Sequence, residues 1–217
     1  MRQCQRSGQV AERPFRLILG ALLLGFAAIR ISYQRRASRG AEPVIRPEHD
    51  QNMVAHASML VIGCAMAIGY LRDARWMRRF TMSLPAWIRW IGACLALAAL
   101  LLLRWAHGAL GTNFSSRLQV RARHTLVTTG PYRWIRHPIY TGFLLFIVGC
   151  GLLSANVLLL LLSIIGIGGV IASRIAREEA LMEESFPGEY QAYKRRTGPL
   201  LPALTPHRSR RDMREDE

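Results

Sequence analysis

The residue types that could do chemistry gather in two polar segments, residues 104–137 and 174–217, on either side of a long apolar stretch. The first segment ends in Arg136-His137-Pro138, which indicates the start of a helix because proline is favoured at the first helical position. A helix N-terminus carries free backbone N–H groups and a partial positive charge. An anion such as a carboxylate would be well placed there.

Aromatic and basic residues of the same stretch also fit a simpler interpretation, a belt at the membrane–water interface. Tyr132, Trp134 and Tyr140 would then lie at headgroup level, with Arg136 on a lipid phosphate. The residue types alone do not decide between such a belt and a ligand site.

Arg174 and Glu178 stand where the last apolar stretch gives way to charged residues. They are four residues apart and hence share one face of a helix. A surface ion pair at this spacing contributes only on the order of a few tenths of a kcal/mol. If the apolar stretch folds back on itself, however, the pair faces residues 124–140, and a cation beside an anion could hold a zwitterionic ligand.

The composition determines the class of protein that must position these residues. The chain has 217 residues, of which 51% are hydrophobic and 20% charged, and its mean hydropathy is +0.14 despite 29 Lys and Arg. Long apolar stretches alternate with arginine-rich ones, which is typical of a polytopic membrane protein and excludes disorder of the whole chain. The net charge of +15 is explained by arginines that flank membrane helices, and we expect no nucleic-acid partner.

Five membrane spans are expected in an all-α protein. Residues 138–173 contain no Asp, Glu, Lys or Arg, and one helix of that length would be too long for a bilayer, so Ser154-Ala155-Asn156 is predicted to be a turn. We expect its two helices to pack through glycines, 149 and 151 on one and 166, 168 and 169 on the other. The predicted spans are 15–31, 53–71, 84–103, 138–153 and 156–173.

Charge bias sets the expected orientation. With five spans, the side that holds the C-terminus carries 19 of the 29 Lys and Arg and the other side 8, which places the C-terminus and both polar segments in the cytoplasm. Arg72, Arg75, Arg78 and Arg79 would then lie outside, against the rule. The first span could be a signal peptide, but an uncleaved span is the preferred interpretation.

The four cysteines, at positions 4, 64, 94 and 150, do not have the spacing of a zinc or redox motif, and we expect no metal.

The order and spacing of motifs from about His124 to Pro202 resemble the isoprenylcysteine carboxyl methyltransferase family of integral-membrane enzymes. The motifs are His124-Thr125-Leu126-Val127, Gly130-Pro131-Tyr132, Arg136-His137-Pro138-Ile139-Tyr140, Arg174 with Glu178-Glu179, and then Leu181, Phe186, Tyr190 and Tyr193.

The resemblance implies S-adenosyl-L-methionine as methyl donor, in a cytosolic pocket over the last helices. It implies that Arg174 binds the acceptor and that both Arg174 and Glu178 act as catalytic residues. Gln119 is a further candidate, because some members have a glutamine where this chain has Arg117. The implied cofactor-binding residues are Gln119, His124, Thr125, Leu126, Val127, Tyr132, His137, Pro138, Ile139, Tyr140 and Glu178.

The implied reaction is carboxyl O-methylation of an isoprenylcysteine-like carboxylate, with a lipophilic or prenylated substrate and membrane lipids as partners. Arg174 favours a carboxylate as methyl acceptor, because its positive charge would not attract the ammonium form of an amine. Two alternatives remain, a phospholipid N-methyltransferase and a non-catalytic membrane module on the same fold. The expected division is N-terminal spans in 1–110, a methyltransferase core in 111–204 and a charged tail in 205–217.

Overall fold

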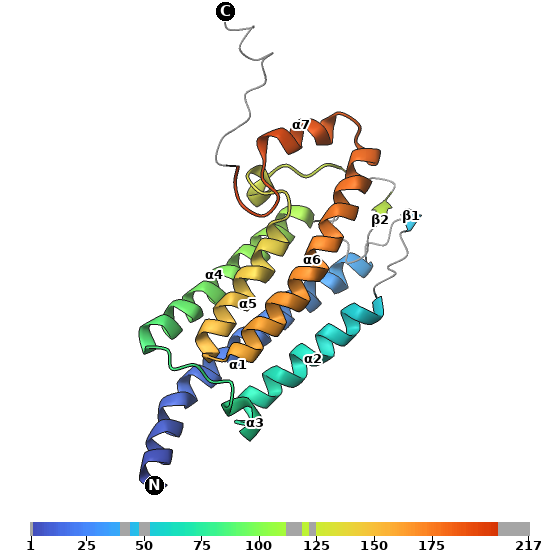
Figure 1. Cartoon of the computed structure of the whole chain (residues 1–217). Helices are drawn as coiled ribbons and strands as arrows, with labels where there is room; N and C mark the ends of the chain where they lie inside the picture. Colours follow the sequence, from blue (N-terminus) through green and yellow to red (C-terminus); the bar gives the residue numbers. More distant parts are fainter. Residues whose placement is uncertain (1, 40–43, 48–52, 112–118, 122–124, 204–217) are drawn as a thin grey trace, which may run out of the picture.

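The computed structural model describes residues 2–39, 44–47, 53–111, 119–121 and 125–203, with side chains over 12–36, 61–111 and 125–203. These parts consist of helices, two short strands and the turns and loops between them, and the longer helices run side by side (Figure 1). The helices are α1 Arg2–Arg39, α2 Met53–Leu71, α3 Arg75–Arg78, α4 Ala86–Leu110, the 3-10 helix η2 Gly130–Arg133, α5 Pro138–Ser154, α6 Val157–Ser185 and α7 Glu189–Arg196.

The two strands are a small departure from the expected all-α class. β1, Val44–Pro47, pairs antiparallel with β2, Gln119–Arg121, so that Pro47 lies opposite Gln119. The pair connects the chain after α1 to the chain after α4. Gln119 therefore lies in an extended strand, and only its backbone position is described.

The expectation of an integral-membrane protein is confirmed. Three helical segments are long and apolar enough to cross a bilayer, namely Glu12–Arg36, Ala86–Leu110 and Val157–Ser185. Two shorter apolar helices, Val61–Leu71 and Pro138–Ser154, lie beside them. Helices thus occupy all five predicted positions, and five as the number of spans stays a prediction.

The turn between α5 and α6 is where the sequence predicts it. Ala155 takes a left-handed conformation with φ +48°, and Asn156 caps α6 by accepting a hydrogen bond from the Leu159 N–H at 3.0 Å. The Asn156 amide also donates to the Met77 carbonyl at 2.9 Å. This side chain therefore fixes the hairpin and ties it to α3.

The expected glycine packing between α5 and α6 is wrong at most of its positions. Gly149 faces α4 instead, where an added Cβ would lie 2.6 Å from the Ala96 nitrogen, and Gly92 of α4 meets the Leu153 nitrogen of α5 equally closely. Added Cβ atoms at Gly168 and Gly169 would meet nothing within 4 Å, and only Gly151 packs against α6, at Leu160. The glycines that approach a neighbouring backbone most closely, Gly92 and Gly149, therefore bring α4 and α5 together.

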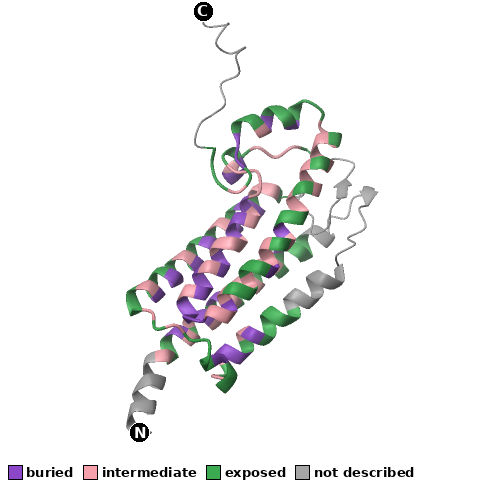
Figure 2. Cartoon of the chain, in the orientation of Figure 1, coloured by how far each residue is buried: buried purple, intermediate pink, exposed green. Residues whose placement is uncertain are grey.

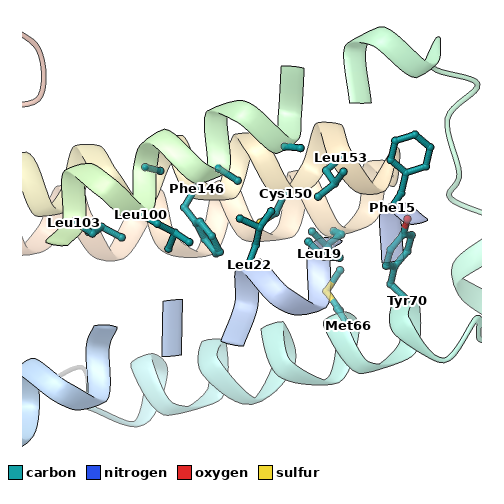
Figure 3. Close-up of a cluster of buried hydrophobic side chains, with 14 of the residues drawn as sticks. Phe15, Leu19, Leu22, Met66, Tyr70, Leu100, Leu103, Phe146, Cys150 and Leu153 are labelled. Carbon is teal, nitrogen blue, oxygen red and sulfur yellow. The ribbon is translucent and has the colours of Figure 1, made fainter. Parts of the chain in front are cut away.

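The buried core lies along this α4–α5 contact and extends to α1, α2 and α6 (Figures 2 and 3). Leu19 of α1 and Met66 of α2 point into the same cluster as Leu100, Phe146 and Leu153. The outward faces of the helices carry exposed Trp, Leu and Ile side chains, as expected for surfaces in contact with lipid.

Charged residues at the end of the bundle near α3 pair with one another. The Arg89 guanidinium, 6% exposed, contacts the two Glu12 carboxylate oxygens at 2.6 and 2.8 Å and donates to the Leu153 carbonyl at 3.0 Å. Asp73 pairs with Arg16 and with Arg78, the latter at 2.6 Å. Arg78 is one of the arginines that oppose the predicted orientation, and it has a protein partner at this end.

Candidate functional site

The start of α5, the end of α6, helix α7 and residues 197–200 meet at the other end of the bundle (Figure 1). The backbone N–H groups of Arg136 and His137 donate to the carbonyls of Gly198 and Pro199 at 2.9 and 3.0 Å. The Tyr193 hydroxyl donates to the Tyr132 carbonyl at 2.7 Å. These bonds connect the two polar segments that the sequence singles out.

The predicted helix start is confirmed, with His137 as N-cap and Pro138 as the first helical residue. The N–H groups of Tyr140 and Thr141 donate to the His137 carbonyl. Several backbone donors near this terminus are therefore already used within the protein. Side chains rather than those N–H groups must supply the contacts to an anion bound here.

Glu178 is the centre of the cluster. Its Oε1 accepts a hydrogen bond from the Tyr140 hydroxyl and lies 3.6 Å from Arg174 Nε, while its Oε2 lies 3.5 Å from His137 Nδ1. The His137 and Tyr140 rings stack with centroids 5.6 Å apart. The expectation that Arg174 and Glu178 face the start of α5 is confirmed.

Glu179 forms a second centre, to which sequence reasoning assigned no role. Its Oε1 lies 2.8 Å from Arg136 Nε and 3.3 Å from His137 Nε2, and its Oε2 lies 2.8 Å from Lys194 Nζ. Arg136 also donates to the carbonyls of Lys194 and Thr197. The adjacent acidic residues and the arginine were visible in the sequence, but their pairing across the fold was not.

The two carboxylates control the charge of His137. Burial on its own would lower the pKa of this imidazole, but its hydrogen bonds to Glu178 and Glu179 outweigh burial and raise the pKa above its ordinary value. His137 therefore holds a proton between two carboxylates to higher pH than a free histidine. Burial raises the pKa of the Tyr132 hydroxyl, so this side chain stays neutral.

The other predicted cofactor residues have different positions. Pro138 and Tyr132 are buried, and Ile139 and Tyr140 are half-buried at the start of α5. Thr125, Leu126 and Val127 lie on the segment that leads into η2, with Thr125 exposed. His124 lies outside the described residues, and the side chain of Gln119 is likewise not described. The structure thus brings together the His137, Tyr140, Arg174 and Glu178 side chains.

The donor set fits a small zwitterion better than a metal ion. Two guanidiniums, an imidazole whose pKa is raised and two carboxylates alternate along contacts of 2.8 to 3.6 Å. Within the part of the chain that the structure describes, no three His, Cys, Asp or Glu side chains are arranged to hold a metal. The amino-acid end of S-adenosylmethionine has both charges that this set could bind.

The helical fold, with a polar site at the end of its last hairpin, is that of a known class of intramembrane protein. The fold matches a solved structure of a eukaryotic intramembrane Ras methyltransferase, isoprenylcysteine carboxyl methyltransferase, with a TM-score of 0.58 and 22% identity. The match covers 88% of this chain and 68% of that one.

The resemblance in sequence is confirmed by the family comparison. Residues 90–184, which run from α4 to the end of α6, match the isoprenylcysteine carboxyl methyltransferase (ICMT) family. The chain is also similar to two protein-S-isoprenylcysteine O-methyltransferases. That of Saccharomyces cerevisiae is 36% identical over 96 residues, which are 43% of this chain and 40% of the relative. That of Xenopus laevis is 32% identical over 120 residues, which are 54% of this chain and 42% of the relative.

The matched region spans about two-fifths of the length of these relatives. The family match, residues 90–184, contains Arg136, His137, Arg174, Glu178 and Glu179, whereas α1, α2, α3 and α7 lie outside it.

Proposed function

We propose that this chain is an S-adenosylmethionine-dependent methyltransferase that esterifies the carboxylate of an isoprenylcysteine-like, lipophilic acceptor. The observation that carries the proposal is the placement of Arg174 and Glu178 against His137 and Tyr140 at the start of α5. A cation and an anion are held side by side there, next to a membrane span. Similarity to protein-S-isoprenylcysteine O-methyltransferases supports the choice of reaction.

The methyl donor supplies a sulfonium-bound methyl group when it is bound. Glu178 binds the ammonium of its amino-acid end, since a carboxylate that already accepts from Tyr140 is fixed in position. Protonated His137 supplies positive charge for the carboxylate of the same end. His124, Thr125, Leu126, Val127, Tyr132, Pro138, Ile139 and Gln119 complete the proposed cofactor-binding set.

Arg174 orients the acceptor. Its planar guanidinium can bind a carboxylate through two parallel hydrogen bonds and leave an oxygen lone pair directed at the methyl carbon. A bound donor would supply its methyl group to that oxygen, and the electron pair of the methyl–sulfur bond would stay on sulfur. A carboxylate is already ionised at neutral pH, so no general base is needed. Positioning and exclusion of water are then the main contributions of the protein.

The proposed arrangement has five spans and a site that faces the cytoplasm. A lipid tail can then reach the site from within the bilayer while the donor arrives from solution. The division into N-terminal spans, 1–110, a core, 111–204, and a tail, 205–217, is part of the same proposal.

Thiol labelling of intact cells tests the orientation. The 154–156 turn is buried, so exposed Ser83 is the better position for a cysteine on the outer side, and exposed Gln191 marks the side of the site. In a background without Cys4, Cys64, Cys94 and Cys150, an impermeant reagent should label Ser83→Cys and not Gln191→Cys. Reversed labelling would reject the cytoplasmic site.

The acceptor class is tested with purified protein in lipid vesicles, methyl-labelled S-adenosylmethionine and a host lipid extract. We expect a labelled product from which mild alkali releases the methyl group, because methyl esters are base-labile. A labelled product that resists alkali would identify an N-methyltransferase. No labelled product with any lipid or prenylated acceptor would favour a non-catalytic module.

A further inference from the structure

Arg30 is a charged residue near the end of the first membrane span, and the proposed function does not use it. It lies on α1, within the candidate span Glu12–Arg36 and outside the region that matches the family. A cationic side chain within a span is costly and is usually retained for a function. Its surroundings show what that function is.

Aromatic packing directs Arg30 to the site. Phe26, one turn earlier on the same face of α1, stacks on Phe146 at 4.7 Å and packs against Phe143 at 5.7 Å. The Arg30 guanidinium lies 5.2 Å from the Phe143 ring centroid, within cation–π range. The Phe143 ring in turn lies 6.3 Å from that of Tyr140. Arg30 is thus separated from a side chain of the site by a single ring.

A buried histidine fixes the guanidinium. His107 is fully buried, with its Nδ1 2.7 Å from the Leu103 carbonyl and its Nε2 3.3 Å from an Arg30 nitrogen. Because a carbonyl can only accept, we assign the imidazole proton to Nδ1, which leaves Nε2 to accept from Arg30. A neutral His107 therefore holds Arg30 in position without cancelling its charge.

The charge of Arg30 acts on the same region as that of Arg174. Arg30 lies within electrostatic range of both Arg174 and Tyr140. Glu178 offers one negative charge to Arg174, His137 and a bound ammonium. Two guanidiniums near one another in low-dielectric surroundings are stabilised when an anion binds between them.

We propose that Arg30 is a second binding residue for the acceptor carboxylate, acting with Arg174 from the opposite side. The inference rests on the proposed function and names a residue of α1 that takes part in it. The N-terminal helix would then contribute to acceptor specificity together with Arg174 of the matched region. It also explains why α1 is held against α5 at the end where the site lies.

Binding of two matched probes tests the inference without turnover. The probes are N-acetylated S-farnesylcysteine, which carries the carboxylate, and its carboxamide, which does not. Their dissociation constants are measured in lipid nanodiscs saturated with the demethylated donor, S-adenosylhomocysteine. Arg30→Gln should reduce the preference for the carboxylate by about tenfold and leave carboxamide affinity unchanged. Arg35→Gln is the control, because Arg35 is exposed on the same helix.

Arg30→Met is the second variant, for use if the glutamine variant does not fold. Its unbranched apolar side chain suits a membrane helix. It should show the same loss of preference. The inference is overturned if the Arg30 variants keep the wild-type preference, or if they weaken both probes equally, as a packing role would. It is also overturned if only the affinity for S-adenosylhomocysteine falls. A wild-type protein with no carboxylate preference would reject the proposed acceptor itself, a result distinct from these.

Discussion

Arg136 Nε lies 2.8 Å from Glu179 Oε1, and both side chains are largely buried, with 10% and 14% of their surface exposed. This contact joins the segment just before α5 to the C-terminal part of α6. The same carboxylate group reaches Lys194 of α7. Three parts of the site, the start of α5, the end of α6 and α7, thus meet at a single acidic side chain.

Glu179→Gln should therefore destabilise the site region. The amide keeps the size of the side chain but removes the charge that Arg136, His137 and Lys194 share. We expect a loss of about 2 kcal/mol in the free energy of unfolding. Thermal unfolding in detergent should show a lower midpoint for this variant than for Glu184→Gln, whose side chain is exposed. Equal midpoints would show that the buried contacts do not stabilise the fold.

Glu178→Gln should act on the donor rather than on the fold. Loss of one charge-assisted contact to the ammonium should weaken S-adenosylmethionine binding by about 1.5–3 kcal/mol. Calorimetric titration of the variant, compared with Glu184→Gln, measures this difference. An unchanged affinity would remove Glu178 from the donor site.

His137 should make stability depend on pH. Its pKa is raised in the folded state above the ordinary value of 6.5, so its protonated form adds stability that is fully present below that value. The added stability is lost as pH rises through the folded-state pKa. Unfolding midpoints of the wild type and His137→Gln, measured from about pH 5.5 to 8.5, should differ most at low pH and converge as pH rises. A constant difference would mean that His137 does not titrate in this range.

Gly149→Ala should weaken the contact between α4 and α5. The added Cβ would lie 2.6 Å from a backbone nitrogen of α4, so a helix must shift, at a cost of about 2 kcal/mol. Gly168→Ala is the matched control, because its Cβ would meet nothing within 4 Å. A lower unfolding midpoint is expected for the first variant alone. If both variants unfold at the wild-type midpoint, the close approach of the helices does not contribute to stability.

The positions of the helices could be predicted from the sequence because they depend on local signals. A charge-free run too long for one span, together with Asn156 as an N-cap, predicts the hairpin, and His137-Pro138 predicts the start of α5. Which helices pack together could not be predicted. Gly149 and Gly168 both lie within apolar helical runs of the sequence. Only Gly149 meets a neighbouring backbone, because α4 lies on that side.

In the candidate site, too, local spacing could be predicted from the sequence and tertiary contacts could not. The spacing of Arg174 and Glu178 predicts a shared helical face, and the resemblance to a known family supplied their proposed roles. Glu179 and Arg30 were not predicted as site residues, because their partners are distant in sequence. Glu179 meets Arg136 across 43 positions, and Arg30 meets His107 across 77. Such pairs follow from tertiary packing rather than from any local pattern.

Turnover by Arg174 variants tests the proposed acceptor most directly. Rates are measured for wild type, Arg174→Lys and Arg174→Ala with an S-prenylated cysteine carboxylate and, separately, with phosphatidylethanolamine. We expect the wild type to esterify the carboxylate, the lysine variant to be slower because it lacks the planar fork, and the alanine variant to be slower still, all with nearly unchanged donor binding. Full activity of Arg174→Ala on the carboxylate, or methylation of phosphatidylethanolamine that is unaffected or improved in both variants, would contradict carboxyl methylation at this site.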